Sequence, residues 1–395
     1  MIKKLVLIAA IGLFTLLISQ TTAVVPLTPP ALQNPHQLKI QETAESARPN
    51  LANYWDGSAS FVVDVPITGL PMGESETRIM QNGEWWSWLH ASDRSAGTVD
   101  QCGDPVEFPG CTVIYKSDDN GITFRPESDP SVCTFACQQC PCDAATDHTP
   151  QQQYPRVSYD GDKLWLVYEY LGRSMLRTSL DGRSFSPPQR VAGTGLWSSN
   201  EFCGANEKIN AHPFAIINTE QCLAGGPPGI FIEGDVVYIF VGLGQSPGGL
   251  GCFVGHKNLP PSQYKRCQNN PLLLGSSVYG DGDLRGAGAN PYWDFRMLSS
   301  ADVHKVGDQY YMLFEGIRGP GPNDPGDTQF GLGLARTVDG KIDGRWEMYP
   351  GNPILVDVPA NIGIGHADLV IDQGTTYLFT SLDGVTRSRL VLRGN

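Results

Sequence analysis

The chain contains 395 residues, with 41 Asp and Glu against 28 Lys and Arg, so its formal net charge at neutral pH is −13. An acidic chain without a basic run is a poor candidate for binding nucleic acid or an anionic membrane. The length allows one large domain or two ordinary ones. Glycine and proline are frequent, long amphipathic helical patterns are absent, and short β-rich runs recur. These features predict an all-β fold.

The first 23 residues have the three-part layout of a secretory signal peptide. Two lysines precede an apolar run from Leu5 to Ile18, and small residues lead to a cleavage position after Ala23. The apolar run is too short for a comfortable membrane span, and no later segment approaches one. We therefore expect signal cleavage near Ala23 and a free mature protein that is secreted to the extracellular space or the periplasm.

The remainder of the chain divides into an arm and one domain. Residues 24–50 carry Pro and Gln with little periodicity, which indicates a linker or a surface arm. Residues 51–395 are expected to form a single domain.

The ten cysteines all lie between Cys102 and Cys267. An even number of cysteines in an exported chain favours disulfides over free thiols. The densest group, at positions 133, 137, 140 and 142, is also open to interpretation as a zinc knuckle, but its spacing departs from paired C-x-x-C motifs. We expect disulfides there, in a connectivity that the spacing leaves open.

Five repeats of strand, glycine-bearing turn and aromatic-rich strand run through the domain. Their strands are expected at 77–80 with 84–90, 155–159 with 163–170, 229–232 with 236–242, 301–305 with 309–316, and 367–371 with 375–381. Such units are hairpins by their turn chemistry. Five hairpins at roughly even spacing, with long connections, predict a five-bladed β-propeller.

Residues 117–124 read S-D-D-N-G-I-T-F, which fits the Asp-box turn, and shorter versions follow the runs 174–178 and 331–337. In this turn the Asp accepts hydrogen bonds from the backbone, Gly supplies positive φ, and the aromatic residue fills the gap between sheets. The pattern indicates blade structure and not catalysis.

Long insertions are expected to gather on one face of the propeller, where each inner strand begins. They cover residues 92–110, 125–154, 193–228, 268–300 and 317–329. At least eight of the ten cysteines lie in or beside them. A face of long, disulfide-stapled loops over the central channel is the expected binding site, although long loops also need stapling for their own sake.

The fourth and fifth repeats resemble the blades of five-bladed propeller glycosidases, the relatives of arabinanases, xylosidases, invertases and levansucrases. The resemblance rests on residues 300–305 with 309–316, on 331–336 with 346 and 350–355, and on the Gly-Ile-Gly-His segment at 363–366. It extends over residues 295–385, weakens over the first three repeats, and is absent from the cysteine-rich loops.

The resemblance implies carboxylate chemistry on the inner strands. Glycoside hydrolysis needs one carboxyl that protonates the leaving oxygen and a second one opposite, which acts as base or nucleophile. The inner-strand candidates are Asp302, Glu76 and Asp368, with Glu74 as a substitute for Glu76.

This sequence departs from the family pattern at three positions. Glu76 replaces an Asp, Asp302 stands where arabinanase relatives have Glu, and residues 229–232 of the third repeat lack an acid. The catalytic set is therefore not carried over intact, and these acids are also open to a structural role in binding loop backbone.

The resemblance also implies substrate contacts and places His366 in the central channel, beside a cation such as a structural calcium; no cofactor is required for the chemistry. Trp86 and Trp88 are expected to pack within a blade. The residues expected to bind substrate are Arg78, Arg296, Glu315, Trp197, Trp293 and His366.

Three functions follow in order of preference. The first is a secreted glycoside hydrolase that acts on a polysaccharide or oligosaccharide. The second is a propeller that binds carbohydrate or protein without turnover, which the missing acid of the third repeat favours. The third is a sialidase, suggested by the Asp-box and by arginines such as Arg78, Arg156, Arg296 and Arg318, but opposed by the five-fold repeat and the acidic charge.

Overall fold

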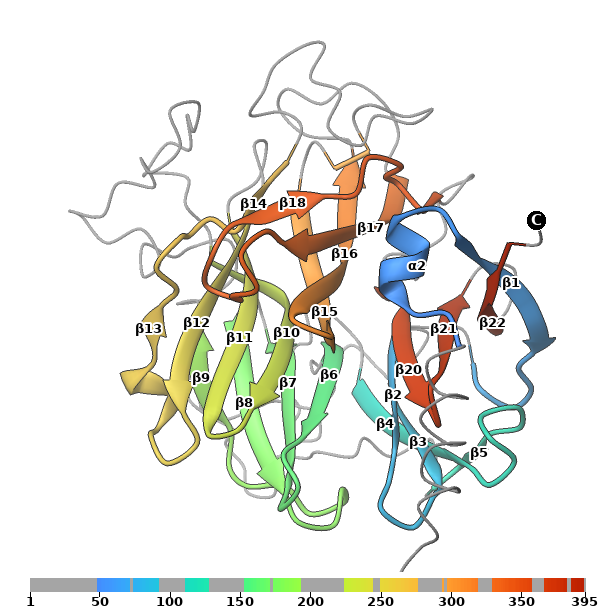
Figure 1. Ribbon diagram of the computed structural model, residues 1–395. Coiled ribbons are helices and arrows are strands. Elements are labelled where there is room, and N and C mark those ends of the chain that lie inside the picture. The colour runs from blue at the N-terminus through green and yellow to red at the C-terminus, as the bar shows by residue number, and fades with distance from the viewer. Residues whose placement is uncertain are drawn as a thin grey trace, which may run out of the picture. The chain divides into compact units, whose positions relative to one another are not determined.

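Five antiparallel sheets make up the fold of this protein in the computed structural model (Figure 1). The structure describes residues 48–71, 74–91, 111–127, 153–170, 173–192, 224–243, 249–275, 293–294, 297–318, 329–356, 366–381 and 385–393. The predicted signal peptide and most of the predicted arm lie outside these residues. The prediction of an all-β five-bladed propeller is confirmed.

Each blade opens with one of the five predicted hairpins. Blade one contains β2 (Ser75–Ile79), β3 (Trp85–Ala91), β4 (Cys111–Ser117) and β5 (Arg125–Pro126). Blade two contains β6 (Gln153–Tyr159), β7 (Leu164–Tyr170), β8 (Arg173–Ser179) and β9 (Gln189–Ala192). Blade three contains β10 (Ala224–Glu233), β11 (Val236–Leu243), β12 (Gly249–His256), β13 (Lys265–Arg266) and β14 (Leu273–Leu274), with the short helix η2 (Pro261–Gln263).

The last two blades follow the same order. Blade four contains β15 (Met297–Val306), β16 (Gln309–Arg318), β17 (Gln329–Thr337), β18 (Trp346–Met348) and β19 (Leu355–Val356). Blade five contains β20 (Asp368–Asp372), β21 (Thr375–Ser381) and β22 (Val385–Leu392), and its fourth strand is β1 (Ala59–Pro66).

The N-terminal strand closes the ring. β1 pairs antiparallel with β22, so that Ala59 lies opposite Leu392 and Pro66 opposite Thr386 (Figure 1, right-hand side). Helix α2 (Leu51–Trp55) precedes β1, and its Leu51 is buried with residues of blades four and five. Closure by a strand from the other end of the chain ties blade five to the start of the domain.

Five hydrophobic clusters lie at the five boundaries between neighbouring blades. In the cluster between blades five and one, Trp85 packs against Phe379 with ring centroids 6.1 Å apart, and Phe124 of the predicted Asp-box turn contacts the same ring. Each sheet therefore buries both faces against its neighbours, which explains the abundance of aromatic residues in the second strands.

The turn after β4 satisfies its own backbone. Asp119 Oδ1 accepts hydrogen bonds from the amides of Ile122 (3.2 Å) and Thr123 (2.8 Å). In the corresponding turn after β8, backbone hydrogen bonds from Ser184 and Arg183 lower the pKa of Asp181 to about 2. Both carboxylates serve the turn, as the sequence pattern predicts for a structural element.

One of the expected disulfides lies within the described residues and joins Cys252 of β12 to Cys267, directly after β13. It staples the third strand of blade three to the chain that follows the fourth. The prediction of disulfides in the long loops falls outside the residues whose side chains the structure describes. No helix among the described residues is long and apolar enough to cross a membrane.

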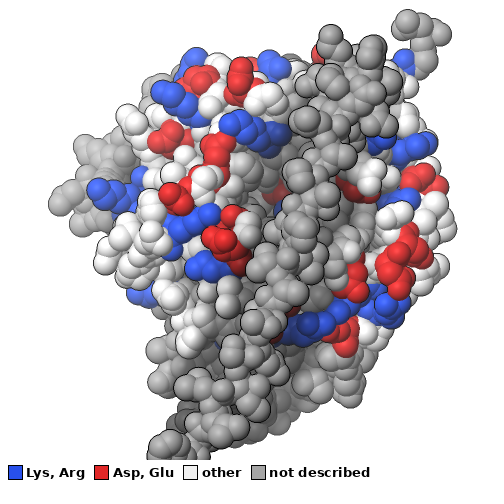
Figure 2. Space-filling model, turned by 60° about the horizontal axis from the view of Figure 1, so that its bottom comes forward, with Lys and Arg blue, Asp and Glu red and all other residues white. Residues whose placement is uncertain are grey.

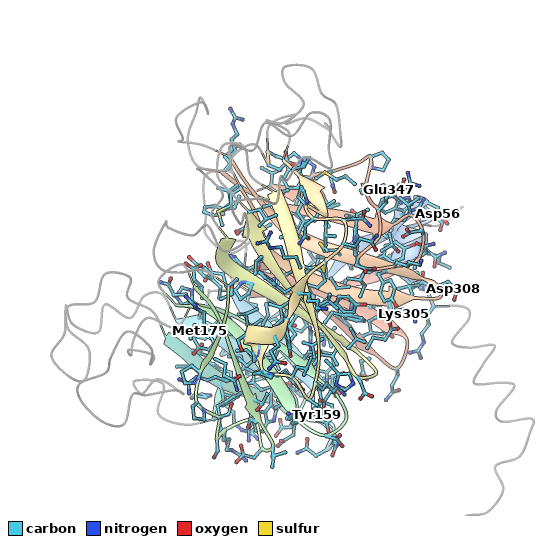
Figure 3. The ribbon with its side chains drawn as sticks, turned by 90° about the vertical axis from the view of Figure 1, so that its left-hand side faces the viewer. Asp56, Tyr159, Met175, Lys305, Asp308 and Glu347 are labelled. Atoms are coloured by element: carbon cyan, nitrogen blue, oxygen red, sulfur yellow. A yellow bond between two sulfur atoms is a disulfide. The ribbon has the colours of Figure 1, made fainter. Side chains whose placement is uncertain are left out.

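Charges of both signs are interspersed on the face that Figure 2 presents. Exposed ion pairs include Arg125 with Asp118 (2.9 Å), Arg336 with Glu347 (2.6 Å) and Lys305 with Glu233 (2.6 Å). Figure 3 shows Lys305 and Asp308 close together at the β15–β16 turn. Surface pairs of this kind contribute little stability.

We expect Gly121→Ala to lower the free energy of unfolding more than Gly83→Ala does. Gly121 (φ 74°) and Gly83 (φ 84°) are both left-handed, so each alanine costs roughly 1–2 kcal/mol in backbone energy. Only at Gly121 would the added Cβ also meet the Trp85 ring, at 2.7 Å, whereas nothing lies within 4 Å of a Cβ at Gly83. Urea denaturation of both variants measures the difference, and equal losses would contradict the packing of the boundary between blades five and one.

Candidate active site

The register of the five hairpins places one residue of each inner strand at an equivalent position around the central axis. These residues lie opposite Trp88, Val167, Phe240, Leu313 and Phe379 of the second strands. We call them the channel ring, which consists of Glu76, Arg156, Gly229, Asp302 and Asp368. The three acids predicted to be catalytic therefore do lie at one level of the propeller.

Acids of the channel ring bind the backbone of the next blade. Asp302 Oδ2 accepts a hydrogen bond from the amide of Leu369 at 2.9 Å, and Asp368 Oδ2 accepts one from the amide of Thr77. Asp302 also pairs with His304 Nε2 (2.9 Å) and with Arg78 Nη2 (3.2 Å). These contacts connect blade four to blade five and blade five to blade one.

Two guanidinium groups lie among the channel ring, that of Arg156 buried and that of Arg78 partly buried. Arg156 Nη1 pairs with Glu76 Oε2 at 2.5 Å, and its Nη2 donates to the carbonyls of Ser300 (3.2 Å) and Ala367 (3.3 Å). Arg78 pairs with Glu76 and donates from Nε to the carbonyl of Val157 at 3.0 Å. Arg78, predicted to bind substrate, thus contacts protein groups from several blades.

The channel-ring position of blade three is glycine for a steric reason. A Cβ at Gly229 would lie 2.1 Å from the carbonyl oxygen of Ala301 in blade four. Any acid at this position would force the two inner strands apart. The absence of an acid from the third repeat, read from the sequence, therefore reflects close strand packing.

The two aspartates of the channel ring have opposite pKa shifts. Burial raises the pKa of Asp302, but His304, Arg78 and Arg156 outweigh it and hold the pKa well below its usual value. Burial and the charge of Glu76 raise the pKa of Asp368 well above its usual value, against the opposing effect of Arg156 and Arg78. Asp368 is thus more readily protonated than Asp302.

A second group of side chains lies one step toward the starts of the inner strands. We call it the mouth cluster, and its members are Glu74, His90, Tyr154, Glu169, Ser300, Glu315 and His366. Because side chains alternate along a strand, Glu74, Tyr154, Ser300 and His366 each precede a channel-ring residue by one strand period. Sequence reasoning found Glu74, Glu315 and His366, and missed Tyr154, His90, Glu169 and Ser300.

Two carboxylate–imidazole pairs stand on either side of Tyr154. Glu74 Oε2 lies 2.9 Å from His90 Nδ1, and Glu315 Oε2 lies 3.2 Å from His366 Nε2. The Tyr154 ring lies edge-on to His90, with centroids 4.9 Å apart, and stacks on His366 at 4.8 Å. Glu74, His90, Glu315 and His366 are all buried.

The carboxylates of Glu74 and Glu315 share one pattern: one oxygen pairs with an imidazole, and the other has no hydrogen-bond partner among the described residues. Among the described residues, Glu74 Oε1, Glu315 Oε1 and His90 Nε2 are buried and have no hydrogen-bond partner. Buried polar atoms of this kind are costly unless water or a ligand satisfies them. Their concentration around Tyr154 marks the mouth cluster as a site for a polar ligand.

The local potential in the mouth cluster is negative. Burial raises the pKa of Tyr154 well above its usual value, and the charges of Glu74, Glu169 and Glu315 raise it further. The phenol therefore stays protonated. For Glu74, burial is outweighed by the hydrogen bond and the charge of His90, which lower its pKa.

Two mouth-cluster residues have strained backbones. Tyr154 (φ 55°) and Ser300 (φ 53°) are left-handed although neither is glycine. Each lies at an irregularity in the pairing of its inner strand, between Gln153 and Arg156 and between Ser299 and Asp302. Bulges and strain of this kind re-aim side chains and concentrate at functional sites.

The structure corrects the predicted role of Trp293. Its side chain is 1% exposed and packs against Phe314, with ring centroids 5.6 Å apart. A Cβ at Gly316, Gly331 or Gly333 would collide with the Trp293 ring, so these glycines make room for it. The prediction of a sugar-stacking platform is wrong, because the ring belongs to the core of blade four. Trp197 and Arg296 lie outside the described residues.

The predicted cation contact of His366 stays a prediction. Both of its ring nitrogens have protein partners, Nδ1 with Ser300 Oγ at 2.5 Å and Nε2 with Glu315. Within the described ranges, no group of three His, Cys, Asp or Glu side chains is arranged to hold a metal ion.

Among known proteins, several solved structures are similar to this chain. No known family model matches the chain, and no curated protein does. An endo-arabinase from Bacteroides thetaiotaomicron is 13% identical, with a TM-score of 0.48 over 85% of this chain and 98% of that one. A thermostable family-43 glycoside hydrolase is 14% identical, with a TM-score of 0.49 over 85% and 96%. The α-L-arabinanase of Cellvibrio cellulosa, solved with arabinohexaose, is 14% identical, with a TM-score of 0.46 over 82% and 91%. Identities this low assign no role to any residue of this chain.

We expect Asp302→Asn and Asp368→Asn to affect stability differently although both stand in the channel ring. The low pKa of Asp302 stabilises the fold above the unfolded-state pKa, and this contribution is lost as pH falls. The raised pKa of Asp368 stabilises the fold only at low pH, and this contribution is lost as pH rises.

At neutral pH, Asp302→Asn should therefore cost about 3–5 kcal/mol because it removes a buried negative charge that pairs with Arg78 and His304. Asp368→Asn, an uncharged mimic, should be neutral or stabilising. Urea denaturation at neutral pH and at pH 4 measures both variants, and equal destabilisation by the two substitutions would refute the assigned charge states.

Proposed function

We propose that this protein is a secreted glycoside hydrolase that cleaves a polysaccharide or oligosaccharide with the carboxyl groups of Glu74 and Glu315. One observation carries the proposal. Two buried carboxylates flank Tyr154, each oriented by an imidazole and each with one oxygen free of partners among the described residues. Secretion rests on the signal-peptide pattern of residues 1–23.

The mouth cluster supplies what glycoside hydrolysis requires. One carboxyl protonates the leaving oxygen while the other acts from the opposite side as base or nucleophile. His90 and His366 fix one oxygen of each carboxylate, which leaves the second oxygen to meet the substrate. The transition state carries positive charge on the sugar ring, and the charges of Glu74, Glu169 and Glu315 around Tyr154 favour that charge.

Under this proposal the channel ring supports the site without contacting substrate. Both oxygens of Asp302 have protein partners, and Glu76 is paired with two arginines. Asp302, Glu76 and Asp368, which the sequence suggests as catalytic, then act by holding the blades in register. Glu74 takes the place of Glu76.

A propeller that binds carbohydrate or a protein partner without turnover is the second candidate. Glu74 and Glu315 are each at most 2% exposed, which favours burial of a bound group over rapid exchange of substrate. A sialidase is disfavoured, because Arg78 and Arg156 are engaged by Glu76 and by blade backbone and are unavailable as a carboxylate clamp.

We expect the oxidised mature protein to release sugar from one of a panel of nitrophenyl furanosides and pyranosides, arabinan, xylan and fructan. Glu74→Gln and Glu315→Gln should each lower turnover about 10²–10⁴-fold, because each removes one proton-transfer group. Reducing-sugar and nitrophenol assays measure the loss, with circular dichroism to verify folding.

Glu233→Gln is the matched control, since Glu233 pairs with Lys305 at a hairpin turn far along the strand from the mouth cluster. It should retain full turnover. Absence of any sugar release, together with retained binding on a glycan array, would replace the proposal with the second candidate.

A further inference from the structure

We propose that Ser300, His366 and Glu315 form a nucleophilic triad that cleaves carboxylic esters. This activity does not rest on glycoside hydrolysis, although both would use the His366–Glu315 pair. It is carried by the contacts that run from Ser300 through His366 to Glu315 and by the backbone conformation of Ser300.

The three side chains are in contact across blades four and five. Ser300 Oγ, in β15, lies 2.5 Å from His366 Nδ1, at the start of the inner strand of blade five. His366 Nε2 lies 3.2 Å from Glu315 Oε2 in β16. A nucleophile within reach of a base, with the base oriented by a third group, is the geometric signature of an activated serine.

The groups around Ser300 and His366 favour proton transfer from the serine to the imidazole. Arg156 can only donate, and its Nη2 lies 2.9 Å from Ser300 Oγ. Glu315 Oε2 accepts from Ser299 Oγ at 2.8 Å and lies 3.2 Å from His366 Nε2. A neutral His366 that carries its proton on Nε2, beside this carboxylate, accepts the Ser300 hydroxyl proton at Nδ1, which is the tautomer that a general base needs.

Two further features suit Ser300 as a nucleophile. Its left-handed backbone (φ 53°) is strained, as is common for residues held at a reacting position. The guanidinium of Arg156, buried and 2.9 Å from Oγ, stabilises negative charge that develops on that oxygen.

The reaction proceeds in two balanced steps. Ser300 Oγ attacks the ester carbonyl carbon and passes its proton to His366 Nδ1; the bond to the alcohol oxygen then breaks, and the leaving alkoxide takes that proton. Water next attacks the acyl-serine and gives a proton to His366 Nδ1. The carboxylic acid leaves, and Ser300 Oγ regains its proton.

The test is covalent labelling with phenylmethanesulfonyl fluoride, followed by peptide mass spectrometry. Because Ser300 is 1% exposed, a small reagent is chosen. We expect the wild-type protein to gain one phenylmethanesulfonyl group, on the peptide that contains Ser300. Ser300→Ala should gain none, and His366→Asn should lower hydrolysis of 4-nitrophenyl acetate about 10²-fold or more.

Ser87→Ala is the matched control, since Ser87 is a buried strand serine that contacts Thr77 Oγ1; it should be labelled like the wild type. A wild-type protein that stays unlabelled, or is labelled elsewhere, overturns the triad even if Ser300→Ala fails to fold. Labelling requires no sugar, so a failed glycoside screen leaves this result intact.

Discussion

Buried charge in the central channel is the constraint on which the propeller depends. Arg78, Arg156, Glu76 and Asp302 lie within reach of one another's electric fields, and removing their charges from water is costly unless they are paired. Besides pairs within one strand, such as Arg78 with Glu76, ion pairs and carboxylates that accept backbone amides of the next inner strand connect neighbouring blades. A blade displaced from its register would leave a buried charge unpaired. The channel ring therefore favours one arrangement of the five sheets.

The candidate site is built on top of this arrangement. Strand alternation places Glu74, Tyr154, Ser300 and His366 in one cluster, each of them two residues before a channel-ring residue. Arg156 belongs to both levels, since it binds Glu76 below and both the carbonyl and the hydroxyl of Ser300 above. Rigid support of this kind holds reacting groups at fixed separations, which is what acid–base and nucleophilic chemistry both require.

Packing explains two features that composition alone presents as anomalies. Gly229 stands where three other blades have acids because the carbonyl of Ala301 occupies the space of its Cβ. The glycines of blade four leave room for the Trp293 ring, which is buried in the core and is not exposed as a platform for sugar. From the sequence alone, a tryptophan near a loop is easily interpreted as a binding residue, because the packing around its ring is not known.

The sequence by itself determined the hairpins, their number and the Asp-box turns, because turn chemistry and strand alternation act over a few neighbouring residues. It also pointed to the inner strands as the place of the acids. Only the tertiary structure decided that β1 closes blade five, that Asp302 and Asp368 bind neighbouring blades, and that Glu74, Tyr154, Ser300, Glu315 and His366 meet. Those contacts join residues far apart in the chain, and they depend on which blades are adjacent and on bulges at Tyr154 and Ser300, which no local pattern encodes.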